Sequence, residues 1–197
     1  MRIPFVDLHA QYLTIKQEID RAIAEVIAES AYIRGPHVDA FEEAWARALG
    51  VKRCVSCANG TDAIYIALRG LGLKPGDEVI TSAHSWISTS ETITQAGGRV
   101  VFCDTDEETF TIDPADIERK ITPATVGIIP VHLYGQPADM GAIMAIAKKH
   151  HLWCSRIALK HISPGTTANS WEPSATLRPF PFIRAKTWVR MGTLDAL

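Results

Sequence analysis

The sequence lacks several features that would by themselves indicate a class of function. Its 20 basic and 22 acidic residues leave a net charge of only −2, so the composition gives no reason to expect a nucleic acid partner. No apolar run approaches the roughly 18 residues that a membrane-spanning helix needs. The N-terminus also lacks the basic and then apolar layout of a signal peptide. We therefore expect a cytoplasmic protein that has no membrane partner.

Cysteine is scarce as well, and the seven histidines are scattered. Four cysteines in 197 residues do not make a disulfide framework. Cys54 and Cys57 form a CxxC pair, a pattern that redox and zinc sites contain, but there is no second CxxC and no histidine pair at ligand spacing. Because the pair lies inside a strand-like segment, we interpret it as structural and predict no metal site.

The first 153 residues carry a regular apolar pattern. Helical spacing extends over residues 11–29, and a second helix is expected to end at Gly50 after a break at Gly35-Pro36. Strands and helices then alternate, with strands over 53–57, 78–82, 99–103 and 126–132 and helices over 61–71, 86–96, from Asp113-Pro114 onward, and over 139–150. Strands that are apolar on both faces indicate a mostly parallel sheet covered by helices, which is an α/β fold.

The most informative segment is the turn Asn59-Gly60-Thr61-Asp62, between the first of these strands and its helix. A helix start leaves backbone N–H groups pointing outward, and the helix dipole favours a phosphate there. Ligands of parallel sheets also collect at the carboxyl ends of strands, where this turn lies. The alternative is that Asn59 or Thr61 only caps the helix, which is the commoner use of such residues.

The composition changes after Trp153. Residues 1–153 contain 14 basic and 20 acidic residues, a net charge of −6, whereas residues 154–197 contain 6 and 2, a net charge of +4. The tail has four prolines and no lasting helical or strand period, and no aspartate occurs between Asp139 and Asp195. We therefore treat 1–153 and 154–197 as two regions, and expect the second to be poorly ordered.

Several segments resemble the DegT/DnrJ/StrS family of sugar aminotransferases, which use pyridoxal 5′-phosphate (PLP), in their order and spacing over about three quarters of the chain. They are Ile3-Pro4-Phe5-Val6-Asp7-Leu8, Gly35-Pro36 before Phe41-Glu42, Asn59-Gly60-Thr61-Asp62-Ala63, Pro75-Gly76-Asp77-Glu78-Val79-Ile80, Phe102-Cys103-Asp104-Thr105-Asp106 with Thr111-Ile112-Asp113, and Pro130-Val131-His132-Leu133-Tyr134-Gly135-Gln136. The resemblance implies an incomplete three-layer α/β/α large domain of the aspartate-aminotransferase-like PLP fold (fold type I). It also implies a sugar nucleotide and an amino donor as partners, and a family homodimer whose assembly is doubtful for this chain.

The resemblance also implies roles for individual residues. Gly60 and Thr61 would hold the cofactor phosphate, and Asp62 would help to fix the turn. Trp86 aligns with an aromatic residue that stacks on the pyridine ring, where it supplies apolar burial and orientation together. The alternative for Trp86 is a core tryptophan at a helix start. His132 and Tyr134 are candidates either for the site or for packing.

The chemistry of the family also needs an aspartate beside the pyridinium nitrogen and a lysine that forms a Schiff base. In the family the aspartate directly follows the strand that begins near Leu152-Trp153, but in this chain Cys154-Ser155-Arg156 contains no acid. Lys160 and Lys186 are present without the family's surrounding residues. We therefore assign no catalytic residue, expect weak or no PLP binding, and expect no activity.

An alternative reading frame accounts for the tail. Ile157 to His161 can be encoded as ATT GCG CTC AAG CAC, followed by AT of Ile162. Read from the third base, this gives Cys-Ala-Gln-Ala-His, which resembles the segment after the family's aspartate. In the same frame, Pro181 to Lys186 permits Phe-Tyr-Pro-Gly-Lys after a serine, and Trp188 to Gly192 permits Gly-Ala-Tyr-Gly. We infer that residues 154–197 are a frameshifted translation.

Three hypotheses therefore stand. The first is amino transfer, usually from glutamate, to a keto-sugar nucleotide as the ancestral function. The second is a non-catalytic fragment with a regulatory or partner-binding role. The third is a lysine-free relative of the sugar dehydratase kind, which predicts an intact sequence around one replaced lysine. The wholly altered tail places this third hypothesis last.

Overall fold

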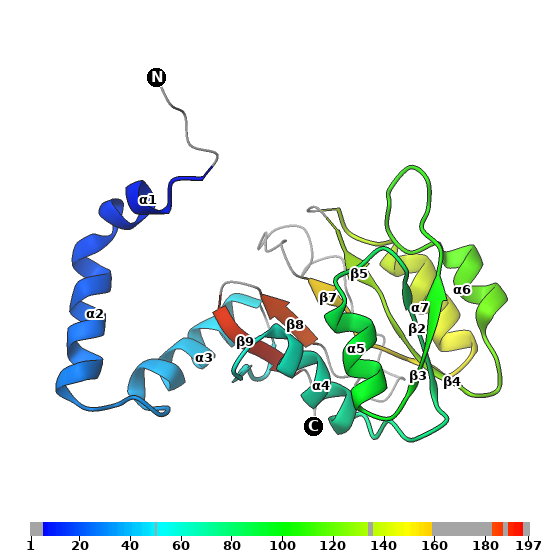
Figure 1. Ribbon diagram of the computed structural model, residues 1–197, viewed down its shortest axis with the longest axis horizontal. Helices are drawn as coiled ribbons and strands as arrows, with labels where there is room; N and C mark the ends of the chain where they lie inside the picture. Colours follow the sequence, from blue (N-terminus) through cyan, green and yellow to red (C-terminus); the bar gives the residue numbers. More distant parts are fainter. Residues whose placement is uncertain (1–5, 50, 134–135, 159–182, 187–188, 195–197) are drawn as a thin grey trace. The chain divides into compact units, whose positions relative to one another are not determined.

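The computed structural model describes residues 6–49, 51–133, 136–158, 183–186 and 189–194. The chain divides into two compact units, residues 1–41 and 42–197. The predicted alternation of strands and helices lies in the second unit (Figure 1). No helix of the described residues is long and apolar enough to cross a membrane.

The first unit is helical. The single helix predicted over residues 11–29 is wrong, because the structure has two helices there, α1 (Leu8–Thr14) and α2 (Lys16–Ala28). Ile15 interrupts them with φ −126° and ψ 17°, outside the helical region. The preceding Thr14 hydroxyl donates to a main-chain carbonyl oxygen three residues earlier, and two successive β-branched residues lower helix propensity. The apolar period alone did not reveal this break.

Helix α3 (Pro36–Leu49) begins before the second unit and ends within it. The later elements, in chain order, are β1 (Val55–Ser56), α4 (Gly60–Gly70), β2 (Glu78–Ser82), α5 (Ser88–Gln95), β3 (Arg99–Cys103), α6 (Pro114–Lys120), β4 (Thr125–Ile129), β5 (Val131–His132), α7 (Met140–Lys149), β6 (Trp153–Cys154), β7 (Ile157–Ala158), β8 (Ile183–Lys186) and β9 (Val189–Leu194). Each predicted helix and strand of this unit has a counterpart within a few residues.

The central sheet has the order β3-β2-β4-β6, and all its pairs are parallel, as predicted. The strand predicted over 126–132 is divided at Pro130, which has no N–H to donate to a neighbouring strand. Beyond the division, β5 pairs in parallel with β7, and Ile157 N donates to the Pro130 carbonyl oxygen at 2.9 Å. The carboxyl ends of the parallel strands therefore lie at one edge of the sheet.

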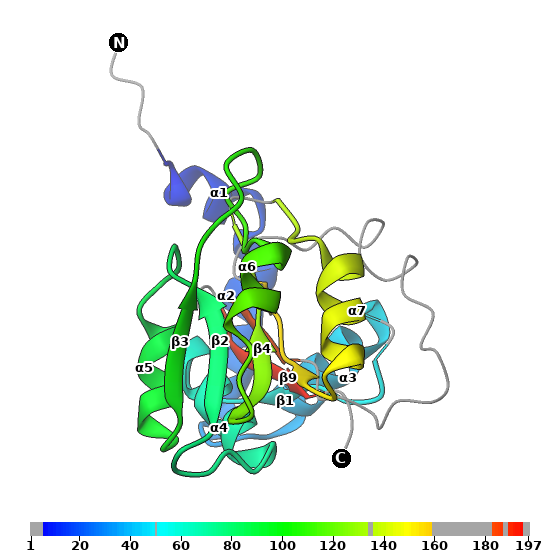
Figure 2. The same cartoon turned by 90° about the vertical axis from the view of Figure 1, so that its right-hand side faces the viewer.

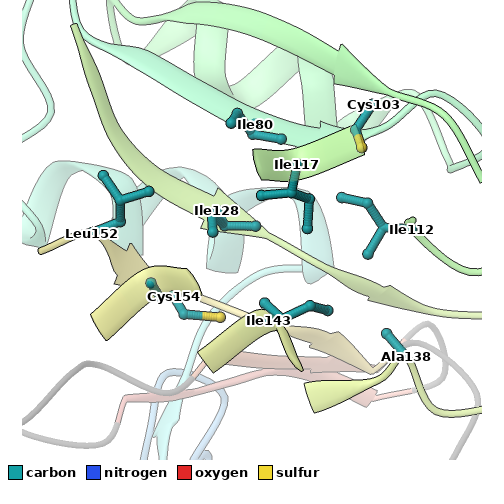
Figure 3. Packing of buried hydrophobic residues seen from close by; sticks show 10 residues of the cluster. Ile80, Cys103, Ile112, Ile117, Ile128, Ala138, Ile143, Leu152 and Cys154 are labelled. Atoms are coloured by element: carbon teal, nitrogen blue, oxygen red, sulfur yellow. The ribbon is translucent and has the colours of Figure 1, made fainter. Parts of the chain in front are cut away.

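Helices cover both faces of this sheet, which gives the second unit the predicted three layers (Figure 2). Alternate residues of each strand pack on the two faces of the sheet, because successive side chains of a strand point to opposite sides. One core joins β2, β4 and β6 to α6 and α7 (Figure 3), and includes Ile80, Ile117, Ile128, Ile143, Ala147 and Cys154. The other joins the sheet to α4 and α5, and includes Ile64, Leu68, Val79, Ile93, Ile129 and Ile157.

A glycine adjusts the packing between β4 and β6. Gly127 lies opposite Trp153 in the strand register. A Cβ atom at Gly127 would overlap the indole ring of Trp153, so only glycine lets this ring lie against the strand. The close approach explains why a glycine interrupts an otherwise apolar strand.

Strands from the tail form further pairs. β9 pairs antiparallel with β1 and with β8, which gives the order β1-β9-β8. This antiparallel sheet was not predicted from the sequence, and the strand expected over 53–57 therefore lies outside the central parallel sheet. Residues 159–182, 187–188 and 195–197 lie outside the described residues, so the expected poor order of the tail stays a prediction.

Candidate functional site

The turn before α4 is closed by two hydrogen bonds between Asn59 and Asp62. Asn59 is extended, and its side-chain oxygen accepts from the Asp62 backbone N–H at 2.9 Å. The Asn59 side-chain amide donates to the Asp62 carboxylate at 2.8 Å. Asn59, rather than Thr61, is therefore the helix cap. Asp62 fixes the same turn from inside the helix.

The cap by Asn59 leaves other backbone N–H groups of the turn available for a ligand. The backbone N–H groups of Gly60 and Thr61 have no acceptor among the described residues. They are the first two amides of an 11-residue helix, where the dipole carries partial positive charge. A phosphate could accept from both amides without displacing the cap. Capping and anion binding are therefore compatible at this turn.

A second helix start lies against the first. The Thr61 hydroxyl oxygen lies 2.8 Å from the Ser88 hydroxyl oxygen, across the beginnings of α4 and α5. Ser88 is buried, whereas Thr61 is partly exposed. Ser88 was not singled out from the sequence, although the run of hydroxyl residues after Trp86 was a signal for polar contacts at this helix start.

Trp86 comes two residues before Ser88, and 70% of its surface is exposed. The alternative of a core tryptophan at a helix start is therefore wrong. An exposed aromatic face beside two helix starts can stack on a flat ring whose phosphate lies on the turn.

The strand that leads into the turn is held from α3. One carboxylate oxygen of Glu42 accepts from the Ser56 backbone N–H at 2.7 Å and from the Ser56 hydroxyl at 2.5 Å. The Cys57 thiol donates to the Asn59 carbonyl oxygen at 3.2 Å. These contacts fix the end of β1 and the backbone that follows it, and Glu42 was not identified in this role from the sequence.

The CxxC pair is not arranged as a disulfide. β1 lies between Cys54 and Cys57, and an extended strand separates residues three apart by about 10 Å, beyond the roughly 7 Å that a disulfide spans. Burial is the main cause that raises the pKa of the Cys54 thiol to about 11, so it is not a reactive thiolate at neutral pH. No group of side chains among the described residues could hold a metal ion.

His132 lies inside the protein rather than open to a ligand. It is buried, and its Nδ1 accepts from the Ala138 backbone N–H at 3.1 Å. Nδ1 therefore carries no proton in this arrangement. The contact favours packing for His132. Tyr134 lies outside the described residues, so its role stays open.

A buried cation follows β6. Arg156 has 5% of its surface exposed, and its positive charge acts to lower the pKa of the neighbouring Cys154 thiol, although burial dominates and raises that pKa to about 12. Arginine keeps its proton in proteins. The resemblance requires an aspartate directly after this strand, where a carboxylate would pair with a pyridinium nitrogen. The described residues therefore fit the phosphate of PLP and the face of its ring, but not the ring nitrogen.

Comparison with known proteins agrees with this geometry. The sequence model of the DegT/DnrJ/EryC1/StrS aminotransferase family matches residues 13–156. The chain is 49% identical over 152 residues to the Pleiotropic regulatory protein of Geobacillus stearothermophilus. This alignment covers 77% of the chain and 41% of that protein. It is 47% identical over 148 residues to the UDP-2-acetamido-2-deoxy-3-oxo-D-glucuronate aminotransferase of Pseudomonas aeruginosa, over 75% of the chain and 41% of the enzyme. The chain thus spans about two fifths of the length of these relatives.

Solved structures are similar over more of the chain. The crystal structure of DesV from S. venezuelae has a TM-score of 0.81 at 32% identity, covering 99% of this chain and 53% of DesV. NtdA from Bacillus subtilis, solved with bound cofactor PMP, has a TM-score of 0.79 at 28% identity, covering 99% of this chain and 45% of NtdA. The predicted aspartate-aminotransferase-like fold is therefore confirmed.

Proposed function

Because the chain belongs to the DegT/DnrJ/EryC1/StrS aminotransferase family, we propose that its second unit carries the cofactor-phosphate turn of a PLP-dependent aminotransferase acting on keto-sugar nucleotides. The observation that carries the proposal is the turn at α4, where the amides of Gly60 and Thr61 are available beside the exposed face of Trp86. When bound, PLP supplies a ring that accepts electrons from the substrate carbon. The residues of the turn bind and orient its phosphate.

The names of two relatives support a substrate class. The Pseudomonas aeruginosa relative is named for a UDP-linked 3-oxo sugar, and a Streptomyces venezuelae relative, 41% identical over 151 residues, is named a dTDP-amino-sugar transaminase. We propose a keto-sugar nucleotide as amino acceptor, glutamate as the usual donor, and a homodimer as the assembly of the complete enzyme.

We further propose that a chain ending in residues 154–197 of this sequence has no transaminase activity. Arg156 stands at the end of the strand that the family follows with an aspartate, and a guanidinium there would oppose a protonated ring nitrogen. The family match ends at residue 156, close to where the alternative reading frame begins. Both observations support a frameshifted tail.

The cofactor turn can be tested with pyridoxine 5′-phosphate, which has the ring and the phosphate but no aldehyde to react with lysines. A helix start contributes on the order of 1 kcal/mol, and one stacking contact about the same, so we expect millimolar or weaker binding. The readout is the shift of the Gly60 and Thr61 amide signals and of the Trp86 indole signal in NMR titrations.

Matched variants separate the two contributions. Thr61→Ala should weaken binding of pyridoxine phosphate, whereas Thr61→Ser should keep it. Trp86→Ala should remove the advantage of pyridoxine phosphate over inorganic phosphate, whereas Trp86→Phe should retain most of it. Micromolar binding that none of these variants changes would show that the site lies elsewhere.

A regulatory role is the second candidate, favoured by the name of the Geobacillus stearothermophilus relative. It predicts that the chain acts through a partner without using its turn. The Thr61→Ala/Trp86→Ala chain distinguishes the two candidates in binding measurements, because it should lose pyridoxine 5′-phosphate and should keep any partner that does not contact the turn.

A further inference from the structure

The contact between Thr61 and Ser88 joins the starts of two helices. Thr61 is the second residue of α4, and Ser88 is the first residue of α5. Their hydroxyl oxygens are 2.8 Å apart, and either hydroxyl can be the donor. In the described residues, no side chain caps α5, so the Ser88 hydroxyl is not occupied as a helix cap.

A phosphate on the turn would settle the direction of this hydrogen bond. A phosphate oxygen without a proton only accepts hydrogen bonds, so the Thr61 hydroxyl must donate to it. A hydroxyl has one proton, so the Thr61 oxygen must then accept from Ser88. The Ser88 proton would thus point to Thr61, and the Thr61 proton would point to the phosphate. Successive hydrogen bonds of this kind polarise and strengthen each other.

Burial distinguishes the roles of the two hydroxyls. Ser88 is 7% exposed and its hydroxyl contacts that of Thr61, whereas Thr61 is partly exposed at the turn. The backbone of Ser88 is also fixed, because the fully buried Thr92 donates its hydroxyl to the Ser88 carbonyl oxygen at 2.7 Å. Ser88 is therefore placed to act on a ligand of the turn through Thr61.

We propose that Ser88 is a positioning residue that orients the Thr61 hydroxyl to donate to a phosphate monoester on the turn of α4. The proposal rests on the proposed function and extends it to a residue outside the turn. It makes phosphate binding depend on the start of α5 as well as on α4.

The test is titration of the whole chain with pyridoxine 5′-phosphate at constant ionic strength, with pyridoxine as the ligand lacking phosphate. The variants are Ser88→Ala, Ser88→Thr, Thr61→Ala and the double variant Thr61→Ala/Ser88→Ala. We expect Ser88→Ala to weaken binding roughly five-fold, the effect of losing one neutral hydrogen bond. Ser88→Thr should restore binding because it keeps the hydroxyl. If Ser88→Ala does not fold, Ser88→Cys replaces it. Ser88→Cys should also weaken binding, because a thiol is a weaker hydrogen-bond donor than a hydroxyl.

The double variant excludes a merely structural role. If Ser88 acts through the Thr61 hydroxyl, Ser88→Ala should cause no further loss in the Thr61→Ala background. A displaced α5 would instead weaken binding in both backgrounds, and that outcome would overturn the proposal. Unchanged binding by Ser88→Ala would overturn it too, while leaving the turn as the phosphate site. Absence of any binding by the unaltered chain would overturn the proposed function and this proposal together.

Discussion

The buried carboxylate of Glu78 forms an ion pair with the guanidinium of Arg99, and the two residues lie opposite each other at the first positions of β2 and β3. The same carboxylate accepts from the Thr122 hydroxyl at 2.5 Å, just before β4. One acidic side chain therefore connects the amino ends of three neighbouring strands. Trp86 and Ser88 of the candidate site follow the opposite, carboxyl end of β2.

This arrangement predicts a stability that falls in acid. The Thr122 hydrogen bond, followed by that of Arg99, lowers the pKa of Glu78 against the opposing effect of burial. Burial also raises the pKa of Asp116, but hydrogen bonds from the Asp104 amide and from Lys120, Cys103 and Arg119 outweigh it, so the net pKa is lowered. A lowered native pKa gives stability that is complete above the unfolded pKa, near 4.3 for glutamate, and is lost as the pH falls through the native pKa.

We therefore expect the free energy of unfolding, measured in urea, to be nearly constant between about pH 7 and pH 5 and to decrease below. Glu78→Gln should lower the stability at pH 7 and make the acid decrease shallower. Glu107→Gln, at an exposed carboxylate, serves as the control and should change neither value. An equally steep acid decrease in Glu78→Gln would contradict the assignment.

Glu42→Ala should destabilise the second unit by about 2 kcal/mol, since it removes the acceptor of two hydrogen bonds to a charged group. Glu42→Gln is the matched control, because its side-chain oxygen can still accept from Ser56. It should cost less than half as much in urea unfolding. If the alanine variant is as stable as the unaltered chain, Glu42 does not hold β1.

Gly127→Ala should cost about 1–3 kcal/mol, as overpacking does in a well-packed interior, because its methyl group would meet the indole ring of Trp153. Adding Trp153→Leu should recover part of this loss. Gly70→Ala is the control at the end of α4, where a Cβ atom would contact nothing within 4 Å. It should be neutral or slightly stabilising. Equal effects of the two single variants would refute the close-packing argument.

PLP should not become attached to a particular lysine of the tail. Lys160 and Lys186 lack the sequence context of the family, and the buried Arg156 does not favour the ring. Borohydride treatment in the presence of PLP, followed by peptide mapping, should give only low and scattered labelling. Complete labelling of one of these two lysines would show that the tail carries a functional cofactor lysine.

The sequence predicted the central fold well because each parallel strand is a short apolar run bounded by clear turn residues. β2 and β3 have the predicted bounds. The break at Ile15 was missed because the apolar period continues through it. The division at Pro130 arises because proline has no backbone N–H group. It was missed because the apolar residues continue on both sides of Pro130.

The candidate site could be predicted only in part. Gly60 and Thr61 follow from local sequence, since a helix start determines where its own amides point. Ser88 and Glu42 are 27 and 14 residues from their partners, so their contacts depend on packing between elements. The exposure of Trp86 likewise required the structure, because a tryptophan at a helix start is compatible with both the core and the surface.

The nucleotide sequence that encodes residues 153–197 decides whether the tail is a frameshifted translation. We predict that one alternative frame encodes Cys-Ala-Gln-Ala-His opposite Ile157–Ile162 and Ser-Phe-Tyr-Pro-Gly-Lys opposite Phe180–Lys186. A family enzyme would then be encoded across a break near Cys154. Codons that give neither segment in any alternative frame would contradict it, and the tail would then be a genuine part of this protein.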